Sequence, residues 1–247
     1  MATQTIDDVR FDVSHDEPVS DVVVAGFSQF GLAGLTAVDY LVEQLELEQT
    51  GHIVAQDLPS ITPFDDGVPR HSTRLLSRDD LNLTVLMSEL FVPVWAAKPF
   101  ARAVLDWTET NAVEEVAILS GVPVPHGPED HRTFYVATED YRSGRLEGSE
   151  VPPMPNGFLD GVNAALVERG MTSSLAVGVY ATPVHAQAPD VDAALNLLDA
   201  VGAVYDLDLE TRPLEEFAER VAQYYAELAE RLEAVPERDT PDDRMYM

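Results

Sequence analysis

The chain has 247 residues, in which 44 Asp and Glu outnumber 15 Lys and Arg and give a formal net charge of −29. Hydrophobic residues make up 45% of the sequence, which is ordinary for a folded protein and excludes a disordered acidic chain. A surface this negative repels phosphate groups, so we expect neither nucleic acid nor a membrane as a partner. Cysteine is absent, which excludes disulfides, thiol nucleophiles and thiolate metal sites.

The charge also indicates the solvent in which the protein works. Lys98 is the sole lysine, and the acidic residues are spread along the chain without forming one acidic tail. This pattern is typical of proteins adapted to molar salt, where charges are screened within about 3 Å. No apolar run approaches the roughly 18 residues that span a bilayer, and the start lacks the apolar core of a secretory signal. We therefore expect a halophilic, cytoplasmic protein.

Strand and helix patterns alternate along the chain. Strands are predicted at 21–26, 52–56, 71–76, 81–88, 116–120, 133–137 and 174–181, from short runs rich in β-branched residues. Helices are predicted at 32–47, 96–110, 158–169 and 191–201, from apolar residues spaced three and four apart. The strands 71–76 and 81–88 form a hairpin, and 141–155 is a polar loop. The pattern predicts a three-layer α/β fold with a mixed, mostly parallel central sheet flanked by helices.

One domain is expected over residues 1–236, with a loosely ordered start at 1–18 and a flexible tail at 237–247. The domain ends in an amphipathic helix that begins just after Pro213 and stops before Pro236. Its apolar seam favours packing on the core. Pairing of the helix with a second copy is the alternative, because the seam follows a heptad for about three turns.

No catalytic set emerges from the sequence. Gly26, Gly31 and Gly34 lie where a phosphate-binding loop would, but the spacing is not that of a dinucleotide or P-loop motif. We interpret these glycines as allowing a tight turn and close packing of helix on strand. The histidines show no metal-ligand spacing, so we expect no metal and no cofactor; they are His15, His52, His71, His126, His131 and His185.

A small-molecule pocket is the weaker hypothesis for a site. Its candidate residues follow the ends of apolar strands, where α/β proteins often bind ligands; they are Gly26, Ser28, Gly31, Glu89 and His126. Glu89 could serve as a general base if its pKa were raised, or it could hold a neighbouring arginine. His126 and His131 lie in one loop, and histidines in loops are more often solvated than catalytic.

The last three residues, Met245, Tyr246 and Met247, give a sharper signal. A hydrophobic residue, a tyrosine and a terminal carboxylate form the type of tail that docks on proteasome rings. There the two side chains fill a pocket and the carboxylate meets a lysine. About eleven residues after Pro236, at roughly 3.3 Å each, could extend some 36 Å. The alternative is an ordinary frayed terminus.

Several stretches in order resemble the archaeal and bacterial proteasome assembly chaperone family. The matching segments are 26–34, 40–45, 58–59, 66–70, 86–89, 117–121, 180–183 and 189–190, followed by the last helix. The resemblance implies a nucleoside-phosphorylase-like α/β fold, homo-oligomers, and a role in assembling rings of proteasome α subunits. It implies no catalytic residues. Ser28 and Gln29 depart from the Pro-Gly or Pro-Asp often found in the family's glycine turn.

Together these observations predict a non-enzymatic chaperone or adaptor. It would bind proteasome α subunits, or the 20S core particle, through Met245, Tyr246 and Met247. The alternative is an enzyme or small-molecule-binding protein that uses the same fold. In molar salt long-range steering is screened, so either function would depend on short-range contacts.

Overall fold

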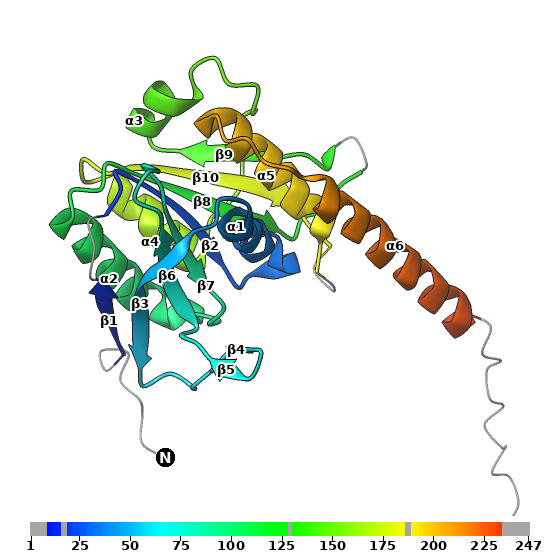
Figure 1. Cartoon of the computed structure of the whole chain (residues 1–247). Helices are drawn as coiled ribbons and strands as arrows, with labels where there is room; N and C mark the ends of the chain where they lie inside the picture. Colours follow the sequence, from blue (N-terminus) through cyan, green and yellow to red (C-terminus); the bar gives the residue numbers. More distant parts are fainter. Residues whose placement is uncertain (1–8, 16–18, 128–129, 186–188, 234–247) are drawn as a thin grey trace, which may run out of the picture. The chain divides into compact units, whose positions relative to one another are not determined.

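The computed structural model describes residues 9–15, 19–127, 130–185 and 189–233. It divides into two compact units, Met1–Glu210 and Thr211–Met247. The first unit contains a mixed β-sheet with helices on both faces (Figure 1). The second contains one long helix, α6 (Arg212–Glu233). The predicted domain boundary at residue 236 falls outside the described residues and stays a prediction.

Eight strands form the main sheet, in the order β1-β3-β6-β7-β2-β8-β10-β9 (Figure 1). They are β1 (Arg10–His15), β2 (Val22–Phe27), β3 (Glu48–Gln56), β6 (Thr73–Ser77), β7 (Thr84–Ser88), β8 (Glu115–Val122), β9 (Phe134–Ala137) and β10 (Ala176–Pro183). β7, β2, β8 and β10 run parallel, and the other four strands pair antiparallel. A separate hairpin joins β4 (Phe64–Asp65) to β5 (Val68–Pro69).

The parallel strands form the centre of the sheet because most of their side chains are apolar on both faces. Every residue of β2 is buried, as is every residue of β7. Continuous burial of this kind requires helices on both sides of the sheet. α1 (Ala33–Gln44) and α5 (Val191–Tyr205) cover one face, while α2 (Ala97–Thr110) and α4 (Gly161–Gly170) cover the other. The predicted three-layer α/β fold is confirmed.

Two stretches differ from the sequence-based expectation. β1 was not predicted, and it lies within the start that was expected to be loosely ordered; it pairs along its length with β3. The loop predicted at 141–155 is wrong at its beginning, where α3 (Glu139–Tyr141) runs into a π-helical turn at Arg142–Leu146. The buried side chain of Tyr141 anchors this turn against β10.

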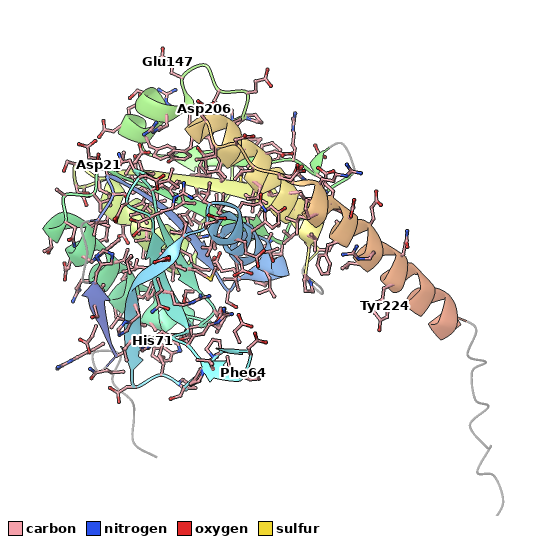
Figure 2. All side chains as sticks on the ribbon, in the orientation of Figure 1. Asp21, Phe64, His71, Glu147, Asp206 and Tyr224 are labelled. Carbon is pink, nitrogen blue, oxygen red and sulfur yellow. The ribbon has the colours of Figure 1, made fainter. Side chains whose placement is uncertain are left out.

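Acidic side chains lie mainly at the outside of the first unit. Asp21, Glu147 and Asp206 are exposed at its periphery, as Figure 2 shows. Among the helices of the described ranges, none is both long enough and apolar enough to cross a membrane.

Candidate functional site

A cavity of about 960 Å³ opens at the carboxyl ends of β2, β7 and β8. The chain places β7 on one side of β2 and then crosses through α2 to place β8 on the other side. The strand order therefore changes direction at β2, and ligands of open α/β sheets bind at such a point. The volume lies in the range of small-molecule sites.

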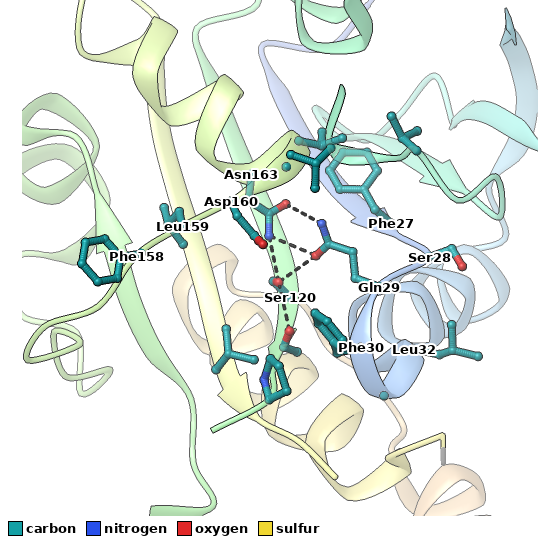
Figure 3. A pocket seen from close by; sticks show the side chains of 18 of the residues that line it. Phe27, Ser28, Gln29, Phe30, Leu32, Ser120, Phe158, Leu159, Asp160 and Asn163 are labelled. Carbon is teal, nitrogen blue, oxygen red and sulfur yellow. Dashed lines mark hydrogen bonds between the residues drawn. The ribbon is translucent and has the colours of Figure 1, made fainter. Parts of the chain in front are cut away.

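Three polar side chains form a hydrogen-bonded triad inside the cavity (Figure 3). The Asn163 amide nitrogen donates to Ser120 Oγ at 2.8 Å and to Gln29 Oε1 at 3.0 Å. Ser120 Oγ donates to the same Gln29 oxygen at 3.0 Å, and Gln29 Nε2 donates to Asn163 Oδ1 at 3.3 Å. Asn163 and Ser120 are buried, so the triad is a fixed set of neutral donors and acceptors.

The remainder of the cavity is largely apolar. Asp160 supplies the sole charged side chain among the lining residues that the structure describes. Large side chains at the lining remain open to solvent: Phe30 is 53% exposed, Phe91 63% and Phe158 103%. Among these described lining residues, neither Ser28 nor Ser120 forms a hydrogen bond with a basic side chain. Its chemistry suits recognition of an apolar group that carries one hydrogen-bonding end.

The glycine turn shapes one wall of this cavity. Gly31 has a φ of +64°, which favours glycine, and a Cβ on Gly34 would lie 2.0 Å from the Leu119 carbonyl oxygen. Gly26 is just as crowded, since an added Cβ would lie 2.5 Å from a Val38 methyl. These distances agree with the interpretation that the glycines allow a tight turn and close packing of α1 on the sheet.

The structure brings only some of the predicted pocket residues together. Ser28 and Gly31 line the cavity, whereas Gly26, Glu89 and His126 are not part of its lining. Glu89 instead pairs with two arginines, accepting hydrogen bonds from Arg70 at 2.8 Å and from Arg74 at 3.3 Å. Of the two roles considered for Glu89, holding a neighbouring arginine is the one for which the structure provides contacts.

Arg74 lies deepest in this cluster, with 8% of its side chain exposed. Burial, reinforced by the neighbouring guanidinium of Arg70, lowers the pKa of Arg74, while Glu89 opposes that shift. One carboxylate oxygen of Glu89 is shared between two cations, and the other is buried without a hydrogen-bond partner. Arg74 lies in β6, Arg70 precedes that strand and Glu89 follows β7. The two ion pairs therefore join these three places in the chain.

His126 lies beside two other histidines, His131 and His185, next to the cavity. Ring nitrogens of all three lie within 4.8 Å of one another. Val124, Pro123 and Pro189 line the cavity close to these histidines in the sequence. The sequence placed His126 and His131 in one loop but gave no reason to add His185.

The sequence matches the PAC2 family over residues 23–229. The chain belongs to the PAC2 family. No curated protein matches it.

Solved structures show how widely this PAC2 fold is shared. Pyrococcus furiosus PbaA, an archaeal homolog of proteasome-assembly chaperone, has a TM-score of 0.82 at 18% identity, over 91% of this chain and 93% of that one. Pyrococcus furiosus PbaB, an archaeal proteasome activator, has a TM-score of 0.75 at 17% identity, over 89% and 99%. A Thermoplasma acidophilum protein of unknown function reaches 0.70 at 23% identity, over 85% and 89%. At these identities the likeness is one of fold.

Two sets of residues in this PAC2 chain were missed by sequence reasoning. The triad of Gln29, Ser120 and Asn163 consists of common polar residues, and only their position in the fold unites them. One signal in the sequence lay close to His185: Asp190 follows it at the start of a predicted helix, as a capping residue would. Nothing in the sequence linked His185 to His126. The predicted tail residues Met245, Tyr246 and Met247 lie outside the described residues, so their role stays a prediction.

Proposed function

We propose that this chain is a non-enzymatic, proteasome-associated chaperone or adaptor. The observation that carries the proposal is the PAC2 match over residues 23–229 in a chain that ends in Met245, Tyr246 and Met247. PbaA and PbaB, which share the fold, are a proteasome-assembly chaperone homolog and a proteasome activator. We assign the partner as proteasome α subunits, alone or in the 20S core particle.

The tail would supply the contact and the body would supply several tails. An apolar side chain, a phenol and a carboxylate suit a narrow pocket that closes on a lysine. We propose a homo-oligomer, supported by the exposed Phe91, Val94 and Phe158 near the cavity. Tethering several tails on one body raises their effective concentration at a ring. The work would take place in a cytoplasm of high salt, for which the dispersed acidic residues are suited.

Co-sedimentation with the 20S proteasome in high salt tests this function. Deletion of Met245–Met247 or the substitution Tyr246→Ala should weaken binding by roughly tenfold or more, since buried aromatic anchors dominate such contacts. Tyr224→Ala is the matched control, because it removes another tyrosine of the second unit, one that is 62% exposed. Binding that survives the deletion in a folded protein would exclude the tail as the docking element.

The cavity favours a second function, binding of a small molecule. A hydrogen-bonded triad within apolar walls would orient a ligand that has an apolar body and one amide, carbonyl or hydroxyl end. Mass spectrometry of a solvent extract from the purified protein should then detect a bound compound. Asn163→Ala should reduce its occupancy, whereas Asn111→Ala, at the C-cap that follows α2 and outside the cavity lining, should leave it unchanged. A clean extract from both proteins would count against this function.

A further inference from the structure

Three histidines from two loops converge beside the cavity. His126 and His131 come from the connection between β8 and β9, and His185 follows the end of β10. Their rings lie face to face or at an angle, with centroids 5.1 Å apart for His126 and His131, 5.0 Å for His126 and His185, and 5.9 Å for His131 and His185. No other group of three possible metal ligands occurs among the residues that the structure describes.

Hydrogen bonds orient two of these rings. His126 Nδ1 lies 2.8 Å from the Val124 carbonyl oxygen, and His185 Nδ1 lies 2.8 Å from Asp190 Oδ2. A carbonyl and a carboxylate both require a donor, so each Nδ1 carries the proton. In a neutral ring with the proton on Nδ1, Nε2 keeps its lone pair. This tautomer, fixed by an outer acceptor, is the usual state of a histidine that binds a metal ion.

Asp190 is itself held rigidly. Its carboxylate accepts hydrogen bonds from the His185 backbone N–H at 2.9 Å and from the Ala193 N–H at 3.0 Å, where it caps α5. Asp190 is thus a buried acceptor, held in place by two backbone N–H groups, that fixes the orientation of His185.

His131 completes the group with a ring nitrogen that has no hydrogen-bond partner. Its Nε2 is buried without a hydrogen bond, and it lies 3.8 Å from Asp190 Oδ1. A buried imidazole nitrogen left unpaired costs free energy, and a metal ion or its bound water would satisfy it. His52 and His71 also stack, with centroids 3.7 Å apart, but no third possible ligand joins that pair among the described residues.

We propose that His126, His131 and His185 bind one divalent transition-metal ion of the zinc class, and that Asp190 is the positioning residue for His185. Imidazole suits zinc, copper and nickel, while magnesium and calcium prefer oxygen ligands. Three nitrogens bound to zinc at about 2.0–2.1 Å lie roughly 3.4 Å apart. The ring nitrogens, now within 4.8 Å of one another, would therefore move closer together by up to about 1.4 Å, and a fourth position would remain for water or a ligand.

The ion would join the loops that border the cavity. Val124, which orients His126, and Pro189, beside Asp190, both line the cavity. The Asp190 N–H also donates to the carbonyl of Gly31 in the glycine turn at 2.8 Å. Metal binding would thus fix three segments of the rim at once. This inference does not depend on the proposed proteasome function.

Isothermal titration of the full chain with Zn²⁺, after removal of metals by a chelator, tests the site. Molar KCl is included to screen the 44 acidic residues. We expect one ion per chain, and Co²⁺ in place of Zn²⁺ should give the visible absorption of a nitrogen-ligated site. His131→Ala and His185→Ala should each weaken Zn²⁺ binding by roughly tenfold or more, while His71→Ala is the matched control and should bind as the unsubstituted chain does.

The substitution Asp190→Asn tests whether Asp190 positions His185, without removing the cap of α5. Asparagine caps helices as well as aspartate does, so α5 is preserved, but the amide is a weaker acceptor for His185. Zn²⁺ affinity should fall by about 10- to 100-fold with an unchanged circular dichroism spectrum. The proposal is overturned if the unsubstituted chain binds no Zn²⁺ in molar salt, or if folded His185→Ala and Asp190→Asn proteins bind it with unchanged affinity.

Discussion

The two ends of β8 and β10 are built differently. Toward their amino ends and along the middle of β10, Tyr141 Oη lies 3.1 Å from Tyr180 Oη and 2.8 Å from Tyr205 Oη, so each phenol has a partner; we call this region the tyrosine end. Beside them Arg145 Nε donates to both carboxylate oxygens of Glu115, at 2.8 and 2.9 Å. At the carboxyl ends, which we call the cavity end, lie a cavity, exposed phenylalanines and a buried histidine nitrogen without a hydrogen bond.

We infer from this difference that the tyrosine end stabilises the fold and that the cavity end serves binding. A buried polar network with every member satisfied makes one part of the fold rigid. Unfilled volume, exposed apolar side chains and an unpaired nitrogen contribute little to stability and are typical of binding sites. We therefore expect perturbations of the tyrosine end to lower the free energy of unfolding, and perturbations of the cavity end to change binding instead. Four measurements test that division, the first two at the tyrosine end and the last two at the cavity.

Alkaline pH should have the largest effect. Burial raises the pKa of Tyr141, Tyr180 and Tyr205 well above the ordinary value near 10. Because the folded-state pKa is raised, the stabilisation is complete below about pH 10 and is lost as pH rises beyond it. At pH 11 the three phenols should lower the free energy of unfolding by about 4 kcal/mol. Denaturant unfolding at pH 9 and 11, followed by circular dichroism, measures this loss.

The sole lysine, Lys98, leaves few other groups to titrate between pH 9 and 11, so the tyrosines dominate this range. The triple variant Tyr141→Phe, Tyr180→Phe, Tyr205→Phe is the control and should show a much flatter dependence on pH. Ionisation of all eight tyrosines near pH 10 in a protein that remains folded would contradict the prediction.

Gly178→Ala is the next largest perturbation, again at the tyrosine end. A Cβ at this position would lie 2.3 Å from Tyr141 Cε1, within a packed core. Overpacking of this kind should lower the free energy of unfolding by about 1–3 kcal/mol. Gly144→Ala is the matched control, because nothing lies within 4 Å of its added Cβ. Equal denaturation midpoints for the two variants would show that the tyrosine end is loosely packed.

The sequence predicts the packed framework better than the open end. β2 and α2 were found because burial leaves direct patterns, a continuous apolar run and a stripe with Phe100, Val104 and Trp107. β1 was missed because Arg10–His15 mixes charged and apolar residues and is half buried at the edge of the sheet. Patterns in sequence record burial, and a half-buried edge leaves only a weak one.

The candidate sites were harder to predict because they depend on distance in space. Gln29 lies 91 residues from Ser120 and 134 from Asn163, and no local spacing connects amide and hydroxyl side chains. His126 and His185 come from different loops, so a search for metal-ligand spacings within one helix could not join them. These groups come together only in the folded chain, near the carboxyl ends of the parallel strands.

Asn163→Ala tests the cavity end with a smaller expected effect. The substitution removes the donor to Ser120 and Gln29 and the acceptor of Gln29 Nε2, but Ser120 still donates to Gln29, and Gln29 lines the open cavity where water can reach it. The free energy of unfolding should fall by about 1 kcal/mol. Denaturant unfolding measures it, with Asn111→Ala as a control that removes a single side-chain hydrogen bond, the one to the Trp107 carbonyl. A loss of several kcal/mol specific to Asn163 would mean that the triad stabilises the fold.

Phe158→Ser should have the smallest effect on stability. Phe158 is fully exposed in the chain, so its removal should change the free energy of unfolding by less than about 0.5 kcal/mol. If this edge contacts a second copy, the same substitution should instead shift the sedimentation coefficient toward a smaller species. Met171→Ser is the control, because Met171 is 74% exposed and lies outside the cavity lining. Unchanged sedimentation for both variants would locate the proposed oligomer contact elsewhere. A clear loss of stability in Phe158→Ser would contradict the inference that the cavity end contributes little to the free energy of unfolding.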